Sequence, residues 1–177
     1  MSRANWWALV TDNGRPSGKP IIQSNNDPAP GFYISTTSLQ NTKCDRRDPS
    51  RHVNSEAINF LVLPGRLALG AKLGDLAVAI RPENGATAFA VYGDVGPVRK
   101  IGEGPIALAN ALKMPSNPKS GDVGHGVVYV VFPGSTEGWP LSQEEIEKKG
   151  GELFAKWGGI EKAKKVFPEH NWSTAKA

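Results

Sequence analysis

Glycine and proline interrupt this chain so often that its apolar runs are no longer than short strands. The 177 residues include 20 glycines and 14 prolines. A Pro-Gly pair closes each of the two most apolar runs, at Pro64-Gly65 after residues 58–63 and at Pro133-Gly134 after residues 126–132. This punctuation is typical of many short strands joined by turns and argues against a helix bundle.

Further strands are predicted on either side of turn signals. Residues 75–81 and 87–93 flank the dipeptide Asn84-Gly85, which favours positive φ and therefore a hairpin. Residues 5–10 and 31–35 are expected to be short strands separated by a polar loop. We expect residues 1–141 to form one mainly β domain, which contains the candidate site residues.

Two helical regions are expected as well. Pro105 is placed at the first position of a helix over 105–114, where no amide donor is needed. Ser142 and Glu145 have the spacing of a capping box. The helical pieces that follow are broken at Gly158-Gly159. We expect residues 142–177 to form a helical C-terminal extension packed on the β domain.

Composition restricts the possible ligands. The formal net charge is +4, but lysines and glutamates alternate in the last third, which indicates a solvated helix face and not a nucleic-acid stripe. No apolar run approaches the roughly 20 residues that span a bilayer. The single cysteine, Cys44, excludes an intrachain disulfide framework and a multi-cysteine zinc site. We expect no metal, no other cofactor, no nucleic acid and no membrane partner, and we expect a monomer.

Two carboxylates lie at predicted turns of the chain. Asp94 follows Gly93 where a strand is expected to stop, and Glu103 lies between two glycines just before the helix. A proton donor and a base on rigid supports are what glycoside hydrolysis requires. The alternative is structural, because Asp94 can cap its own turn and Glu103 can complement the helix dipole. Asp94 and Glu103 are nine residues apart with a turn between them. This spacing allows either the shorter carboxylate separation of a retaining glycosidase or the longer one of an inverting glycosidase.

Several segments, in order between residues 31 and 140, resemble the chitosanases of glycoside hydrolase family 75. The resemblance is carried by YISTTSLQ (33–40), RRDPSRHVNSEAINFLVLPG (46–65), GDLAVAI (74–80), AVYGDVGPVRKIGEGPIALANAL (90–112), YVVFPGS (129–135) and GWP (138–140). It implies endo-hydrolysis of the β-1,4 linkages of partly deacetylated chitosan with inversion. It also implies that the catalytic pair is Asp94 and Glu103. Glu103 as base and Asp94 as acid is one assignment, and the reverse stays open.

The chain departs from the family pattern at three positions. Pro105 stands where serine is common, and His52 and Asn54 stand where an aromatic residue and an aspartate are more usual. The tail beyond Ser142 lies outside the resemblance. The block around Asp94 also resembles the double-psi β-barrel domains of expansins and family 45 glucanases, which implies a six-stranded double-psi barrel.

Other side chains are candidates for binding sugar, each with a structural alternative. Asp75 and Asp48 offer negative charge to an amino sugar, or serve as turn residues. Trp139 offers an indole face to a pyranose ring, or packs in the core. His125 can reach the cleft from a loop, or lies on the surface. Hydroxyl groups near the end of a strand offer hydrogen bonds, or belong to ordinary hairpin packing: Tyr33, Ser35, Thr37 and Ser38.

The expected partner is a polysaccharide, chitosan. Two alternatives to hydrolysis remain: a non-hydrolytic carbohydrate-binding or wall-loosening module on an expansin-like barrel, and an immunity, inhibitor or phage-associated wall protein that retains the fold. The resemblance implies an extracellular location, although the start of the chain, MSRANWWALVTDNGRP, does not have the pattern of a signal peptide.

Overall fold

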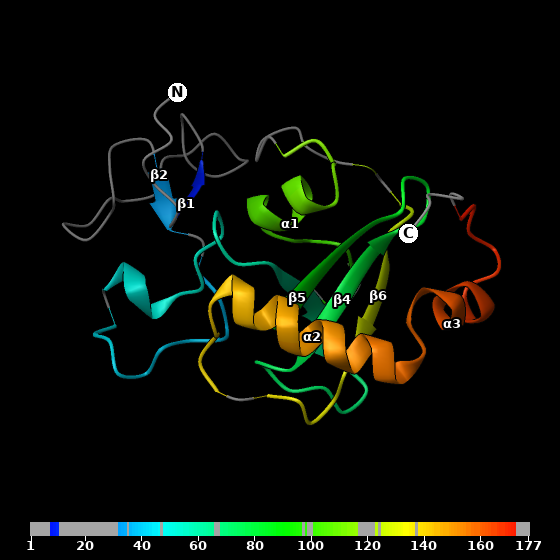
Figure 1. Ribbon diagram of the computed structural model, residues 1–177. Coiled ribbons are helices and arrows are strands. Elements are labelled where there is room, and N and C mark those ends of the chain that lie inside the picture. Colours follow the sequence, from blue (N-terminus) through cyan, green and yellow to red (C-terminus); the bar gives the residue numbers. More distant parts are fainter. Residues whose placement is uncertain are drawn as a thin grey trace.

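The centre of the molecule is a four-stranded sheet in the order β3 (Phe60–Pro64), β5 (Ala86–Gly96), β4 (Leu76–Arg81), β6 (Val128–Val131). The computed structural model describes residues 8–10, 32–34, 36–46, 48–65, 68–96, 98, 101–116, 123, 125–136 and 138–172. Strand β3 runs parallel to β5, and the other pairings are antiparallel. Figure 1 shows the strands crossing the middle of the molecule behind helix α2 (Gln143–Trp157).

The predicted hairpin is confirmed. Strands β4 and β5 pair antiparallel from Leu76↔Val91 to Arg81↔Ala86. Gly85 has φ +71° in the turn, a conformation that glycine adopts without strain. The side-chain oxygen of Asn84 accepts a hydrogen bond from the amide of Ala86 at 2.9 Å, which closes the turn locally.

A β-bulge precedes Asp94. Leu61 is opposite Tyr92 but Val62 is opposite Asp94, so Gly93 has no partner in β3. A Cβ atom at Gly93 would lie 2.7 Å from the Cβ of Phe60, so glycine is required for this close approach. After the bulge, Asp94 and Gly96 are opposite Val62 and Pro64. Opposite residues of parallel strands point to the same face, and Asp94 therefore shares a face with Val62.

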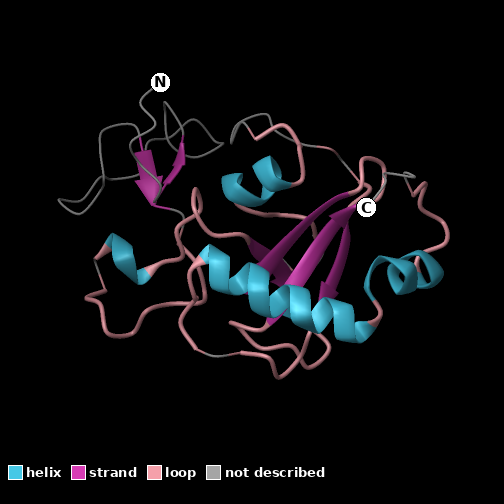
Figure 2. Ribbon diagram, viewed as in Figure 1, coloured by secondary structure: helices cyan, strands magenta, loops and turns pink. Residues whose placement is uncertain are grey.

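Helices cover both faces of the sheet. Helix α1 (Ile106–Ala111) packs on one face through Leu108, with Leu112 just beyond the helix end. Helices α2 and α3 (Gly159–Val166) pack on the other face through Ile146, Phe154 and Ala163. The sheet is therefore the middle layer of three, as Figure 2 shows. The inner strands carry continuous apolar runs because they are buried on both sides.

The start of α2 agrees with the sequence prediction, whereas α1 ends at Ala111, three residues before the predicted end at residue 114. Ser142 and Glu145 form the predicted capping box, and Gly158 ends α2 with φ +119°. Pro105 is extended and immediately precedes α1, so this helix begins one residue later than predicted. Ile146 is fully buried in the same cluster as Phe60 and Val62, so α2 shares a core with the sheet.

The mainly β class is confirmed, whereas a closed six-stranded double-psi barrel is not. The two predicted short strands are present as β1 (Ala8–Val10) and β2 (Phe32–Ile34), and they pair with each other in a separate sheet. Within the described ranges the central sheet has four strands. In a closed barrel, one face of the sheet would be buried in the barrel interior. Here the sheet stays open, and helix α2 covers the apolar side chains of that face instead (Figure 1). No helix in the described part of the chain is long and apolar enough to cross a membrane.

Candidate active site

Asp94 lies near the end of β5 on the face that α2 covers, and its carboxylate is held in one orientation. Its Oδ1 atom accepts hydrogen bonds from the amide of Ser38 at 2.8 Å, the hydroxyl of Ser38 at 2.6 Å and the amide of Val95 at 2.9 Å. All three donors bind the same oxygen. Among the described residues, none donates to Oδ2, so that oxygen is available to a ligand on the half-buried side chain.

The carboxylate of Glu103 lies near Gly96, two residues beyond Asp94 in β5. Its Oε2 atom is 3.7 Å from the position that a Cβ atom would take at Gly96. Gly96 is two residues beyond Asp94 on the same strand face, about 6.7 Å along an extended strand. Gly102, with φ +107°, allows the chain to turn back at this point, and the Glu103 side chain is exposed. The structure thus brings both carboxylates to one surface.

The segment 36–40 positions Asp94 and does not present a row of hydroxyls to a ligand. Thr37 is buried, and its hydroxyl donates to the carbonyl of Leu39 at 2.7 Å and accepts from the amide of Val53 at 3.1 Å. Ser38 is exposed and bonds to Asp94. Of the other predicted hydroxyl groups, the side chain of Tyr33 in β2 and the whole of Ser35 lie outside the described residues.

His52 also belongs to this region, although sequence reasoning assigned it no role. The Nδ1 atom of His52 lies 3.0 Å from the amide nitrogen of Thr37 and 3.3 Å from the carbonyl oxygen of the same residue. We assign the proton of the neutral ring to Nε2, because a proton on Nδ1 would meet the Thr37 N–H group at the shorter contact. Burial lowers the pKa of His52, while the nearby charge of Asp94 acts in the opposite direction. Its position as a departure from the family pattern was the signal in the sequence that could have identified it.

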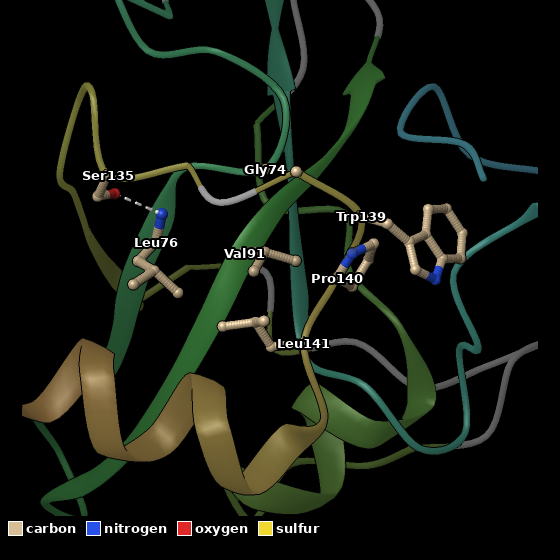
Figure 3. A pocket seen from close by; sticks show the side chains of 8 residues that line it. Gly74, Leu76, Val91, Ser135, Trp139, Pro140 and Leu141 are labelled. Carbon is tan, nitrogen blue, oxygen red and sulfur yellow. Dashed lines mark hydrogen bonds between the residues drawn. The ribbon is translucent and has the colours of Figure 1, made fainter. Parts of the chain in front are cut away.

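An open groove of about 330 Å³ begins at His52. One wall is formed by the segment from Ser50 to Ile58 and the other by the segment from Trp139 to Ser142, which leads into α2. Trp139 therefore lines a groove, as sugar stacking requires. Figure 3 shows its indole pointing away from Leu76 and Val91, which line a separate cavity of about 10 Å³ that is too small for a sugar.

Asp75 is buried and has a structural role. Its side chain is completely inaccessible to solvent. Its Oδ2 atom accepts from the amide of Lys72 at 2.7 Å and its Oδ1 atom accepts from the amide of Thr136 at 2.9 Å. These bonds join two loops that are 61 residues apart in sequence. A sugar has no access to this carboxylate, which corresponds to the structural alternative considered for it.

Asp48 and His125 are not brought to the carboxylate pair. Asp48 accepts from the hydroxyl and the amide of Ser50 at 2.6 and 2.8 Å, and these bonds lower its pKa. Asp48 therefore serves as a turn residue, the structural alternative considered for it, next to Ser50 at the edge of the groove. His125 is exposed and lies three residues before β6 begins at Val128. Val128 is opposite Ile80 in β4, and Ile80 is opposite Thr87 in β5, which is about 23 Å along β5 from Asp94. Within the described ranges, no group of three or more histidine, cysteine or acidic residues has the arrangement of a metal site.

Comparison with known proteins identifies the family. The sequence profile described as fungal chitosanase of glycosyl hydrolase group 75 matches residues 45–158. The match includes α2 but ends before α3, so the expectation that the tail beyond Ser142 lies outside the resemblance is wrong for α2. Ile146 and Phe154 explain why, because they complete the core on one face of the sheet. No curated protein matches the chain. With well over half of its residues matched, and both Asp94 and Glu103 among them, the chain belongs to glycoside hydrolase family 75, the fungal chitosanase family.

Proposed function

We propose that the chain is an endo-acting chitosanase that cleaves β-1,4 linkages with inversion, using Asp94 and Glu103. The observation that carries the proposal is the position of Glu103 over Gly96, on the strand face that also bears Asp94. The family supplies the reaction class, glycoside hydrolysis of chitosan. Inversion is the outcome that the family resemblance implies, and it requires a separation of roughly 6.5–9.5 Å between the two carboxyl groups, which leaves room for a water molecule.

The two carboxylates divide the chemistry between them. One protonates the glycosidic oxygen as the bond breaks, and the other removes a proton from the water that attacks the opposite face of the sugar. In the assignment we favour, which follows the family resemblance, Asp94 is the acid, and the three hydrogen bonds that its Oδ1 atom accepts fix the orientation of its carboxyl group. Glu103 is then the base that activates water.

The direct test is hydrolysis of a panel of polymers. The protein is incubated with chitosan, chitin, cellulose and peptidoglycan, and the products are sized by mass. We expect internal cleavage of chitosan, with new reducing ends that form first as the α anomer by NMR. Binding of chitosan without any reducing ends would instead support the non-hydrolytic carbohydrate-binding alternative. Initial formation of the β anomer would overturn the inverting mechanism.

Ser38 provides a prediction about the orientation of Asp94. Ser38→Ala removes the 2.6 Å hydroxyl bond but keeps the backbone amide bond. Because one hydrogen bond to a charged group contributes about 1.5 kcal/mol, we expect kcat on chitosan to fall about tenfold with little change in KM. Thr42→Ala, at an exposed turn position, is the control. Unchanged kcat in Ser38→Ala would show that the hydroxyl does not position the acid.

The proposed location follows from the substrate. Chitosan is a polymer of cell walls, so the proposed site of action is outside the cell. The proposed active form is a monomer. A clustered set of acids would counter the +4 net charge of the chain locally and attract a cationic polymer. Of the acids considered from the sequence, Asp94 and Glu103 are accessible, Asp48 is bonded to Ser50 in its own turn, and Asp75 is buried.

A further inference from the structure

The groove beside Asp94 differs in chemistry from the carboxylate pair. No described residue that lines it carries a carboxylate or an ammonium group. Its walls combine apolar side chains, including Val53, Ile58 and Leu141, with the indole of Trp139 and a few uncharged polar groups. A sugar that carries an ammonium group would lose hydration there without gaining a charged partner, which is unfavourable.

The polar side chains that remain available in the groove are hydrogen-bond donors. The Oδ1 atom of Asn54 accepts from the amides of Glu56 at 3.0 Å and Ala57 at 3.1 Å, so its Nδ2 group is left to donate. His52 accepts through Nδ1 from Thr37, so its Nε2–H group is also left to donate. Neither donor is bonded to a described residue. An amide carbonyl matches two such N–H groups, whereas an ammonium group, which only donates, does not.

The hydroxyl groups in the groove are already bonded to acids at its edges. Ser50 donates to Asp48 at 2.6 Å, and Ser142 bonds to Glu145 at 2.9 Å. These carboxylates lie behind their serines and do not line the groove. Arg51, the nearest cation in sequence, is directed to Gln40 and the carbonyl of Cys44. The ligand surface therefore keeps its uncharged, donor-rich character.

The groove is adjacent to the carboxylate pair. His52 accepts from the amide of Thr37 and Asp94 accepts from the amide of Ser38. These are consecutive residues, with Cα atoms about 3.8 Å apart. A sugar chain that passes Asp94 can therefore place a neighbouring unit in the groove.

We propose that this groove is a subsite for an N-acetylglucosamine unit, held by N–H donors from His52 and Asn54 and by apolar contact with the acetyl methyl group. The inference rests on the proposed function, because it assigns part of the same sugar-binding surface. It adds to the substrate class that the family implies the position of one unit, an acetylated sugar in the groove beside the cleaved linkage.

Asn54→Asp tests the subsite without removing its fold. An aspartate keeps the oxygen that accepts from Glu56 and Ala57, but it replaces the donor with a negative charge. Binding is measured in the Glu103→Gln background, to prevent turnover, with glucosamine pentamers that carry either one or no acetyl group. We expect the singly acetylated pentamer to bind more tightly to the parent, and Asn54→Asp to reduce its preference about tenfold. Asn110→Asp, at an exposed position of α1, is the matched control.

His52→Phe provides a second variant, since it removes the N–H donor and keeps an aromatic ring. We expect a smaller loss of preference for the acetylated pentamer, with no gain for the free amine. Equal binding of both pentamers by the parent, or an unchanged ratio in Asn54→Asp, would overturn the subsite. Selective binding without hydrolysis of any chitosan would overturn the proposed function and leave the subsite standing. Hydrolysis of chitosan without any preference for the acetylated pentamer would overturn the subsite and leave the proposed function standing.

Discussion

Replacing Asp94 with asparagine is expected to lower turnover on chitosan by about 10³-fold, because a positioned acid or base typically contributes 10²- to 10⁴-fold. The substitution is nearly isosteric, and the amide oxygen can still accept the bonds from Ser38 and Val95. The fold should therefore survive, and the loss should appear in kcat. Release of reducing ends, measured beside far-UV circular dichroism, checks this expectation.

Glu103→Gln is expected to cause a loss of similar size, and chemical rescue separates the roles of the two acids. If Asp94 is the acid, Asp94→Asn should keep most of its activity on a substrate with a good leaving group, which needs no proton. If Glu103 is the base, Glu103→Gln should regain activity with azide, which attacks without giving up a proton. Glu152→Gln, at an exposed position of α2, is the control. Near-normal turnover in either active-site variant would remove it from the catalytic pair.

Asp75→Asn is expected to lower the free energy of unfolding by about 3 kcal/mol, since each hydrogen bond to a charged group contributes roughly 1.5–3 kcal/mol. Asp75 accepts from Lys72 and Thr136 through different oxygens, and an asparagine would direct an NH₂ group at one of these two amide donors. The site is fully buried, so water does not compensate. Urea denaturation followed by tryptophan fluorescence measures the change.

The kinetics of the same variant distinguish a structural role from a binding role. Because Asp75 has no access to a sugar, the folded variant should keep the KM of the parent for chitosan. Asp48→Asn, which alters a turn at the molecular surface, should lose less stability than Asp75→Asn. A raised KM with unchanged stability would show that Asp75 binds the substrate after all.

Much of the fold could be predicted from local patterns. The apolar run before Pro64-Gly65, the Asn84-Gly85 turn and the Ser142–Glu145 capping box each specify a local structure through a short-range cause, and each is present. The order of strands in the sheet was not predictable in this way. It depends on which faces the helices bury, and the position of α2 over the sheet is a long-range choice.

In the candidate site, too, local features could be predicted from the sequence, whereas long-range contacts could not. Asp94 and Glu103 were identified as corners, but their nearness depends on the bulge at Gly93 and on the absence of a side chain at Gly96. Spacing in sequence does not contain that information. The burial of Asp75 was equally invisible, because its partners are amides of loops distant in sequence. His52 was not assigned a role, since its hydrogen bond to Thr37 gains meaning only beside Asp94.

The bond between Ser38 and Asp94 spans 56 residues of sequence. Closing so long a loop carries an entropic cost that short-range contacts avoid, so it is expected late in the folding reaction. The hairpin of β4 and β5 can form while the acid at its end still lacks a fixed orientation. Competence for catalysis should therefore emerge only once the contact between Ser38 and Asp94 has closed, later than the hairpin of β4 and β5.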